Sequence, residues 1–136
     1  MKQLTYGLSI RLRLPFERAI AAARDALRQE GFGVLTEIDV RKTLKEKIGA
    51  DFQPYVILGA CNPSLAFTAL QDDIELGLLL PCNVTVRQEE GGSVVSVMDP
   101  LLMAKLSGAP GLIDVSRLAR QKLERVLEQL TAASGE

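Results

Sequence analysis

The sequence of 136 residues contains no histidine. Without an imidazole side chain, a Ser-His-Asp or Cys-His catalytic arrangement cannot form, and metal sites that rely on histidine are excluded. The glycine-rich signatures Gly-x-x-x-x-Gly-Lys-Ser/Thr and Gly-x-Gly-x-x-Gly are absent too, so a P-loop or a dinucleotide fingerprint has no support. The motifs therefore leave open whether the protein is an enzyme, and we favour a protein that catalyses no reaction.

The sequence also lacks a surplus of positive charge, since 16 Lys and Arg residues are balanced by 17 Asp and Glu residues. Proteins that bind the phosphate backbone need such a surplus to displace counterions, so we expect no nucleic-acid partner. No apolar run approaches the roughly 20 residues that a membrane span requires. Arg11 and Arg13 lie where a signal peptide would be apolar. We expect a cytoplasmic protein that does not contact the membrane.

Cysteine is scarce, and the two that occur are Cys61 and Cys82. Two cysteines are too few for a disulfide scaffold, and they lack the Cys-x-x-Cys spacing of thioredoxin-like proteins. If they have a chemical role, we expect reduced thiols. Unpaired cysteine is among the most buried residue types, so the simplest interpretation, which we place slightly ahead, is that both are small buried apolar residues.

Hydrophobic periodicity predicts strands and helices that alternate along the first half of the chain. Alternating apolar and polar residues indicate strands, whereas apolar residues three or four apart indicate helices. The continuous apolar run at 55–60 predicts a strand that is covered on both faces. Strands are predicted at 4–14, 34–40, 55–60 and around 84–86 and 95–97, and helices at 15–30, 40–48, 63–70, 101–106 and 115–130.

These elements predict an α+β fold. We expect a two-layer sandwich in which helices pack on one face of a mixed, mainly antiparallel sheet of about five strands. The length suits a single domain that spans residues 1–136, with residues 131–136 as a frayed tail.

The most suggestive chemistry lies at Cys61, between a buried strand and the first turn of a helix. Asn62 can cap that helix, and Pro63 fits its first position. The helix-start amides carry partial positive charge, which favours a thiolate at Cys61. If the strand after Pro81 lies beside the strand that ends at Cys61, the two sulfurs approach each other. Two thiols can close a redox disulfide or bind a soft metal such as zinc or copper, although two ligands are too few for a structural zinc.

Glu37 and Asp39 form a second candidate, because two carboxylates two residues apart on a strand share one face. Such a pair can serve in acid–base chemistry. Asp39, however, directly precedes a predicted helix and is well placed to cap it. We therefore consider catalysis by this pair the less favoured interpretation.

The segments 57–63 and 77–84, with residues 37–40 as a third landmark, resemble the family of domains of unknown function numbered 302. The resemblance implies a compact α+β domain, often a homodimer, in a family without an established biochemical role. The sequence departs from the family at Phe67, where a His or Tyr is common. The family motif maps onto Glu37, Asp39, Cys61, Asn62, Pro63, Pro81, Cys82 and Asn83.

Three functional hypotheses follow. The first, which we favour, is a small-ligand-binding or stress-associated module with a pocket at the turn formed by Cys61, Asn62 and Pro63. The second is a thiol redox or soft-metal-binding protein that uses Cys61 and Cys82. The third is a purely structural homodimer whose motif residues serve packing. The candidate ligand-binding residues are Glu37, Asp39, Cys61, Asn62, Pro63, Cys82 and Asn83.

Overall fold

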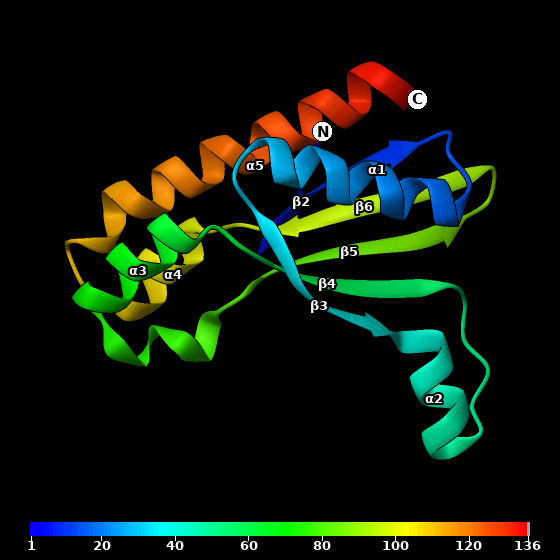
Figure 1. Cartoon of the computed structure of the whole chain (residues 1–136), viewed down its shortest axis with the longest axis horizontal. Coiled ribbons are helices and arrows are strands. Elements are labelled where there is room, and N and C mark those ends of the chain that lie inside the picture. The colour runs from blue at the N-terminus through cyan, green and yellow to red at the C-terminus, as the bar shows by residue number, and fades with distance from the viewer. Residues whose placement is uncertain (136) are drawn as a thin grey trace.

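The computed structural model describes residues 1–135 and contains one antiparallel sheet with helices packed on it (Figure 1). The sheet order is β1-β2-β6-β5-β4-β3, and every pairing between these strands is antiparallel. The α+β fold is confirmed. The sheet has one strand more than the five predicted, and the additional strand, β1, has only two residues. The prediction allowed for some parallel pairing, which does not occur among the described strands. The strands are β1 (Lys2–Gln3), β2 (Gly7–Leu12), β3 (Gly33–Asp39), β4 (Tyr55–Cys61), β5 (Cys82–Glu89) and β6 (Gly92–Met98).

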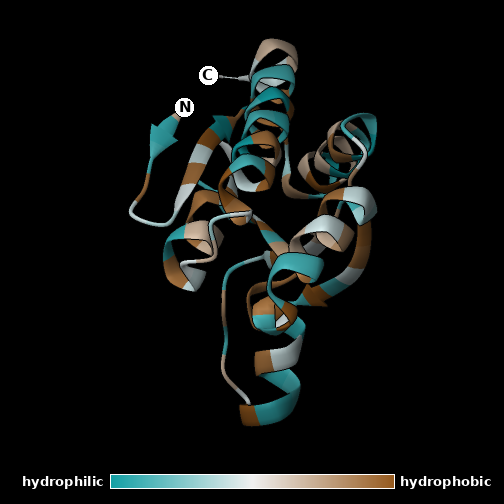
Figure 2. Cartoon of the chain, turned by 90° about the vertical axis from the view of Figure 1, so that its left-hand side faces the viewer, coloured by the Kyte–Doolittle hydropathy of each residue, from teal (hydrophilic) through white to brown (hydrophobic). Residues whose placement is uncertain are grey.

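The helices divide into three groups around this sheet (Figure 1). Helices α1 and α5 lie over one face, α3 and α4 gather beside the start of α5, and α2 projects away from the body. In the end view the projecting helix stands apart below the other elements (Figure 2). The helices are α1 (Phe16–Gln29), α2 (Val40–Ile48), α3 (Pro63–Asp72), the 3₁₀ helix η1 (Ile74–Leu79), α4 (Leu101–Ser107) and α5 (Leu112–Ser134).

The larger hydrophobic cluster, called here the main core, lies between the sheet and helices α1 and α5. Alternation along β2 turns Leu8, Ile10 and Leu12 to this side, where all three are buried. Leu8 is paired across the sheet with Val97, and Val97 with Val84, so apolar residues line up in rows. The helices complete the core with Ala19, Ala23, Ala26, Leu27, Leu123, Val126, Leu127 and Leu130.

A smaller hydrophobic cluster, called here the lateral cluster, lies beside the sheet where α3, η1, α4 and the start of α5 meet. Its buried members are Ala69, Leu76, Met103, Leu112 and Val115. The 3₁₀ helix that brings Leu76 into this cluster was not predicted from the sequence. It begins where the side chain of Asp73 accepts a hydrogen bond from the backbone N–H of Glu75.

Two strand predictions need correction. The first strand begins at Gly7 rather than at residue 4, because the backbone N–H of Leu4 donates to the carbonyl of Gly7 and turns the chain back toward β1. Strand β4 is buried on one face only: Val56 and Leu58 are buried, whereas Tyr55 and Ile57 remain partly exposed. The face of β4 that carries Tyr55 and Ile57 therefore lacks the cover that the apolar run predicted.

Helix α5 continues to Ser134, beyond the point at which the sequence predicted a frayed tail. Thr131 donates a side-chain hydrogen bond to the carbonyl of Leu127, and the backbone N–H of Arg13 donates to the carbonyl of Ser134. Gly135 forms a β-bridge with Leu12. The last residue of the predicted tail, 136, lies outside the described residues. Among residues 1–135, no helix combines the length and apolarity needed to cross a bilayer.

Candidate functional site

The site is organised by the turn between β4 and α3. Strand β4 ends at Cys61, and Asn62 adopts the extended conformation of a helix cap, with φ −98° and ψ 105°. Its Oδ1 accepts a hydrogen bond from the backbone N–H of Leu65 at 3.3 Å, and Pro63 occupies the first turn. The helix therefore begins where the sequence predicts, directly after Cys61 and Asn62.

Asn62 also ties this turn to the segment that follows α1. Its Nδ2 donates to the backbone carbonyl of Glu30 at 3.4 Å. The next residue, Gly31, has φ +84°, and a Cβ atom there would lie 3.0 Å from the Asn62 Nδ2. Glycine is therefore favoured both by the left-handed backbone and by the close approach of the amide. One side chain thus holds together two segments about thirty residues apart in the sequence.

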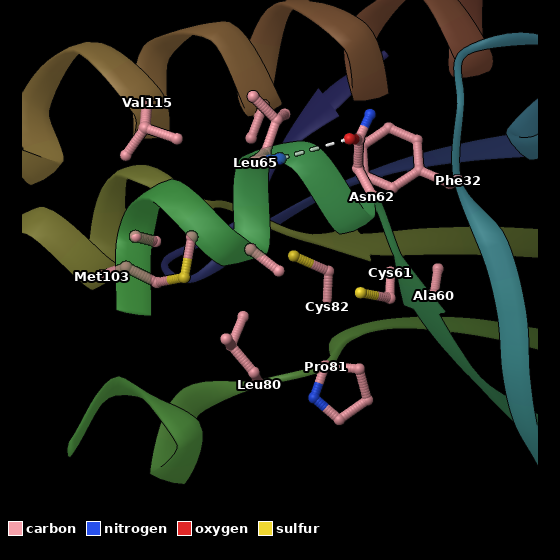
Figure 3. Close-up of a pocket in the computed structure, with 13 residues that line it drawn as sticks. Phe32, Ala60, Cys61, Asn62, Leu65, Leu80, Pro81, Cys82, Met103 and Val115 are labelled. Atoms are coloured by element: carbon pink, nitrogen blue, oxygen red, sulfur yellow. Dashed lines mark hydrogen bonds between the residues drawn. The ribbon is translucent and has the colours of Figure 1, made fainter. Parts of the chain in front are cut away.

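Both thiols lie at this turn. Ala60 of β4 pairs with Cys82 of β5, and Cys61 directly follows Ala60 in the sequence. Neither thiol is in a disulfide, and Cys82 is buried whereas Cys61 is partly exposed. Figure 3 shows the two sulfur atoms pointing in the same direction from neighbouring strands. The structure brings the two cysteines to one place, as expected if the strands were adjacent.

The environment of Cys82 disfavours its thiolate. Burial raises the pKa of this thiol to about 11, and negative charge on Cys61 raises the pKa as well. Cys82 is therefore protonated at neutral pH and is a poor nucleophile in the free protein. Any attack by a thiolate at this turn falls to Cys61, which is the more accessible of the two.

The two thiols border a cavity of about 30 Å³. The wall is almost wholly hydrocarbon and sulfur, and it connects the two hydrophobic clusters: Ala60 belongs to the main core, whereas Met103 belongs to the lateral cluster. Such a volume exceeds the space of about 10–15 Å³ that one water molecule needs, but it is far below that of a drug-sized site. The lining residues are Phe32, Ala60, Cys61, Asn62, Leu65, Ala66, Ala69, Leu80, Pro81, Cys82, Met103, Val115 and Ala119 (Figure 3).

Of the predicted ligand-binding residues, Cys61, Asn62 and Cys82 line this cavity. Pro63 shapes the turn without forming part of the wall. Asn83 points to the other side of the sheet from its neighbour Cys82, because successive residues of a strand alternate, and it lines a separate groove with Tyr55 and Thr85. Asn83 therefore lies outside the cavity that the thiols border, and its role in ligand binding stays a prediction.

The two carboxylates also lie away from the cavity. Glu37 and Asp39 pair with Leu58 and Val56 of β4, several residues before Cys61. Glu37 forms an ion pair with Arg24 at 2.6 Å, and Asp39 accepts from the backbone N–H of Lys42 at 2.9 Å to cap α2. The cap was predicted. Strand β3 carries the two carboxylates toward the projecting helix and away from the thiols, and their role in ligand binding stays a prediction.

Sequence reasoning missed the distant part of the wall. Met103 comes from α4, and Val115 and Ala119 come from α5, far along the chain from either cysteine. Their local pattern signals only a buried helix face, so no sequence feature linked them to the thiols. Phe67, the position at which the sequence departs from the resembled family, is 66% exposed and is not part of the wall.

The donor atoms available for a metal ion are sulfurs. Within residues 1–135, no group of three or more His, Cys, Asp or Glu side chains is close enough together to hold a metal. A four-ligand zinc site cannot therefore be assembled from such side chains within this part of one chain. The two thiols and the thioether of Met103 are the soft donors around the cavity.

Comparisons with known proteins agree on one family. The family model described as "Domain of unknown function DUF302" matches residues 8–130. A crystal structure of an uncharacterised conserved DUF302 protein from Bacillus stearothermophilus is 30% identical, with a TM-score of 0.85, and the match covers 93% of this chain and 99% of that one. No curated protein matches the chain.

Proposed function

The chain belongs to the DUF302 family, and we propose that this member is a binding module whose cavity beside Cys61 and Cys82 takes up a ligand of very few atoms. The observation that carries the proposal is the apolar cavity of about 30 Å³ at the junction of the two hydrophobic clusters. Interiors are normally packed to the density of organic crystals, so a space of this size beside two free thiols supports binding at this place.

The arrangement favours binding over bond breaking. The only polar side chain apart from the thiols in the cavity wall is that of Asn62, and both ends of its amide are already engaged with Leu65 and Glu30. Cys82 is held protonated by burial. A ligand in this cavity therefore meets hydrocarbon and sulfur, which select by size and polarisability rather than by hydrogen bonding.

Xenon tests whether the cavity accepts a guest, because dry apolar cavities bind this atom. We expect xenon pressure to shift the backbone amide signals of Ala60, Leu65 and Ala69 in a saturable way. Ala66→Leu puts a larger side chain into the wall and should abolish these shifts. Ala21→Leu makes the same change on the exposed side of α1 and should preserve them. Xenon shifts that are absent, or equal in both variants, would contradict the proposal.

A reversible disulfide is the second candidate, and the common direction of the two sulfurs supports it (Figure 3). The Cys61 thiolate would attack a small disulfide such as oxidised glutathione and release one glutathione thiolate. Cys82 would then lose its proton and attack the Cys61 sulfur, releasing the second glutathione. Two electrons from the protein reduce the oxidant to two thiols. Intact mass should fall by two hydrogens, whereas a stable glutathione adduct on Cys61 would oppose this function.

We rank the disulfide as the second candidate, after ligand binding, because the attack on the Cys61 sulfur requires the thiolate of Cys82, and the raised pKa of Cys82 disfavours that thiolate. Reduced thiols are typical of the cytoplasm, which supports that location as a proposal. If neither xenon nor an oxidant acts on the site, the remaining hypothesis is a structural role for the motif residues.

We also propose a homodimer. Its support is the sheet face opposite α1 and α5, where Tyr55 and Ile57 are only partly buried and Ile38 is 47% exposed. Sedimentation equilibrium decides the point: a dimer has twice the chain mass of 14.8 kDa, and Ile38→Lys should shift it toward that single-chain mass.

A further inference from the structure

Three sulfur atoms lie around the cavity, and we propose that it binds Cu(I) through the thiolates of Cys61 and Cys82 and the thioether of Met103. This inference rests on the proposed function, because it requires that the cavity accept a guest, and it names the chemical class of that guest. Met103 was not among the residues that the sequence pointed to.

The three sulfurs come from separate elements that the fold holds in place. Cys61 ends β4, Cys82 begins β5, and the pairing of Ala60 with Cys82 fixes these two relative to each other. Met103 lies in α4, is 4% exposed and belongs to the lateral cluster. Figure 3 shows the sulfur atoms of all three side chains at the pocket.

The donor set matches a soft monovalent ion. Thiolate and thioether ligands select Cu(I), whereas a structural zinc site has four ligands. The described residues offer two cysteines and a methionine at this place, with no third His, Cys, Asp or Glu to join them. A cavity of about 30 Å³ also suits a bare ion better than an organic ligand, whose sites are about ten times larger.

Binding requires no transfer of electrons. The S–H protons of Cys61 and Cys82 leave to solvent, two sulfur–copper bonds form, and copper remains Cu(I) throughout. Two thiolates and one monovalent cation leave one negative charge in an apolar wall. The positive end of the α3 dipole, which begins two residues after Cys61, offsets part of that charge.

The exposure of the ligands indicates a path of entry. Cys61 is partly exposed, whereas Cys82 and Met103 are buried behind it. The ion therefore meets Cys61 first, and Cys82 and Met103 complete its coordination from the buried side. Ala66 and Ala69 also line the cavity, and their small side chains leave space inside it.

The test is a titration of the full reduced chain with Cu(I) in competition with the chromophoric Cu(I) chelator bicinchoninate. We expect one equivalent to bind, and X-ray absorption should find only sulfur around the copper. Cys61→Ser and Cys82→Ala should each weaken binding by about 100-fold or more, since even the loss of a group that merely orients a ligand costs 10–100-fold.

Met103→Leu and Met98→Leu are the matched pair, because Met98 lies at the end of β6 and outside the cavity wall. We expect Met103→Leu to weaken Cu(I) binding by about 10-fold and to remove one sulfur from the absorption spectrum, and Met98→Leu to change neither. Circular dichroism verifies that the variants fold, and this conservative pair remains decisive if a cysteine variant does not.

Two results would overturn the inference: no Cu(I) retained against the chelator, or affinity and sulfur count unchanged by Cys61→Ser and Met103→Leu. The xenon experiment separates this failure from that of the proposed function. Xenon shifts without Cu(I) binding would refute only the identity of the ligand, whereas a cavity that excludes xenon would remove the basis of both.

Discussion

The main core and the lateral cluster differ in how completely they are enclosed. The main core has nineteen buried residues between a sheet and two helices, whereas the lateral cluster has five. Around the smaller cluster, large apolar side chains remain exposed, among them Phe67, Ile74, Leu78 and Leu106. The cavity lies where the two clusters meet. Two packing units of different geometry join imperfectly there, and the space left over is where the thiols lie.

The largest expected effect tests whether stability resides mainly in the main core. Leu127→Ala should lower the free energy of unfolding by about 3–4 kcal/mol, because this side chain is fully buried between helix and sheet. Leu76→Ala in the lateral cluster should cost about 2–3 kcal/mol, since its less enclosed surroundings can relax into the space. Urea unfolding of both variants measures the difference.

Leu78→Ala is the control, because this residue is 83% exposed and its loss should change stability by less than about 0.5 kcal/mol. An equal or larger loss from Leu76→Ala than from Leu127→Ala would break the comparison, since it would show that the smaller cluster is packed as tightly as the main core.

The second prediction tests whether the junction of the clusters is as dry as their interiors. The pKa of Cys82 is raised from 9.0 to about 11 in the folded chain, so the folded state keeps a proton that the unfolded state releases between these values. Stability is therefore fully present below pH 9 and falls as the pH rises toward 11, by about 2 kcal/mol from this group. Urea unfolding from pH 8 to 11 measures the decline.

Cys82→Ala isolates the contribution of this thiol from every other effect of pH on stability. The variant should lose less stability between pH 9 and 11 than the wild type does, by that same amount. If the free energy of unfolding of the wild type and of Cys82→Ala changes with pH in the same way, water reaches the Cys82 sulfur. The junction of the two clusters would then be hydrated.

The sequence predicted most of the fold because local signals agreed with it. Alternation in β2, the Asn62-Pro63 cap and the Gly91-Gly92 turn each match the structure. The apolar run of β4 was misjudged because its sequence is the same whether one face or both are covered. The turn at Leu4 was missed because apolar and polar residues alternate through it.

The site was predicted only in its local part. Cys61 and Asn62 were predicted to lie together because they are neighbours in the sequence. Cys82 was predicted to join them if its strand paired with the strand that ends at Cys61, as it does. Met103 reached the cavity through a tertiary contact that no spacing in the sequence announces. Glu37 and Asp39 were grouped with the thiols although strand register carries them away, and register is a property of the assembled sheet.

The smallest expected effect comes from removing a helix N-cap, and comparing two such caps tests whether stability depends on how well the helix is enclosed. Asn62 caps α3, which packs into the lateral cluster, and Asp39 caps α2, in which no residue is buried. Asn62→Ala should lower the global free energy of unfolding by about 1 kcal/mol. Its loss also breaks the contact with the carbonyl of Glu30, which ties α3 to the end of α1.

Asp39→Ala removes a shorter and therefore better hydrogen bond, yet it should leave global stability nearly unchanged. Helix α2 contributes no buried side chain, so it can unfold locally while the main core and the lateral cluster stay intact. Hydrogen exchange separates the two cases: Asp39→Ala should speed exchange only at residues 40–48, whereas Asn62→Ala should speed it across the whole chain. Equal global losses would mean that α2 is coupled to the core despite its exposure, and stability could then no longer be assigned to enclosure alone.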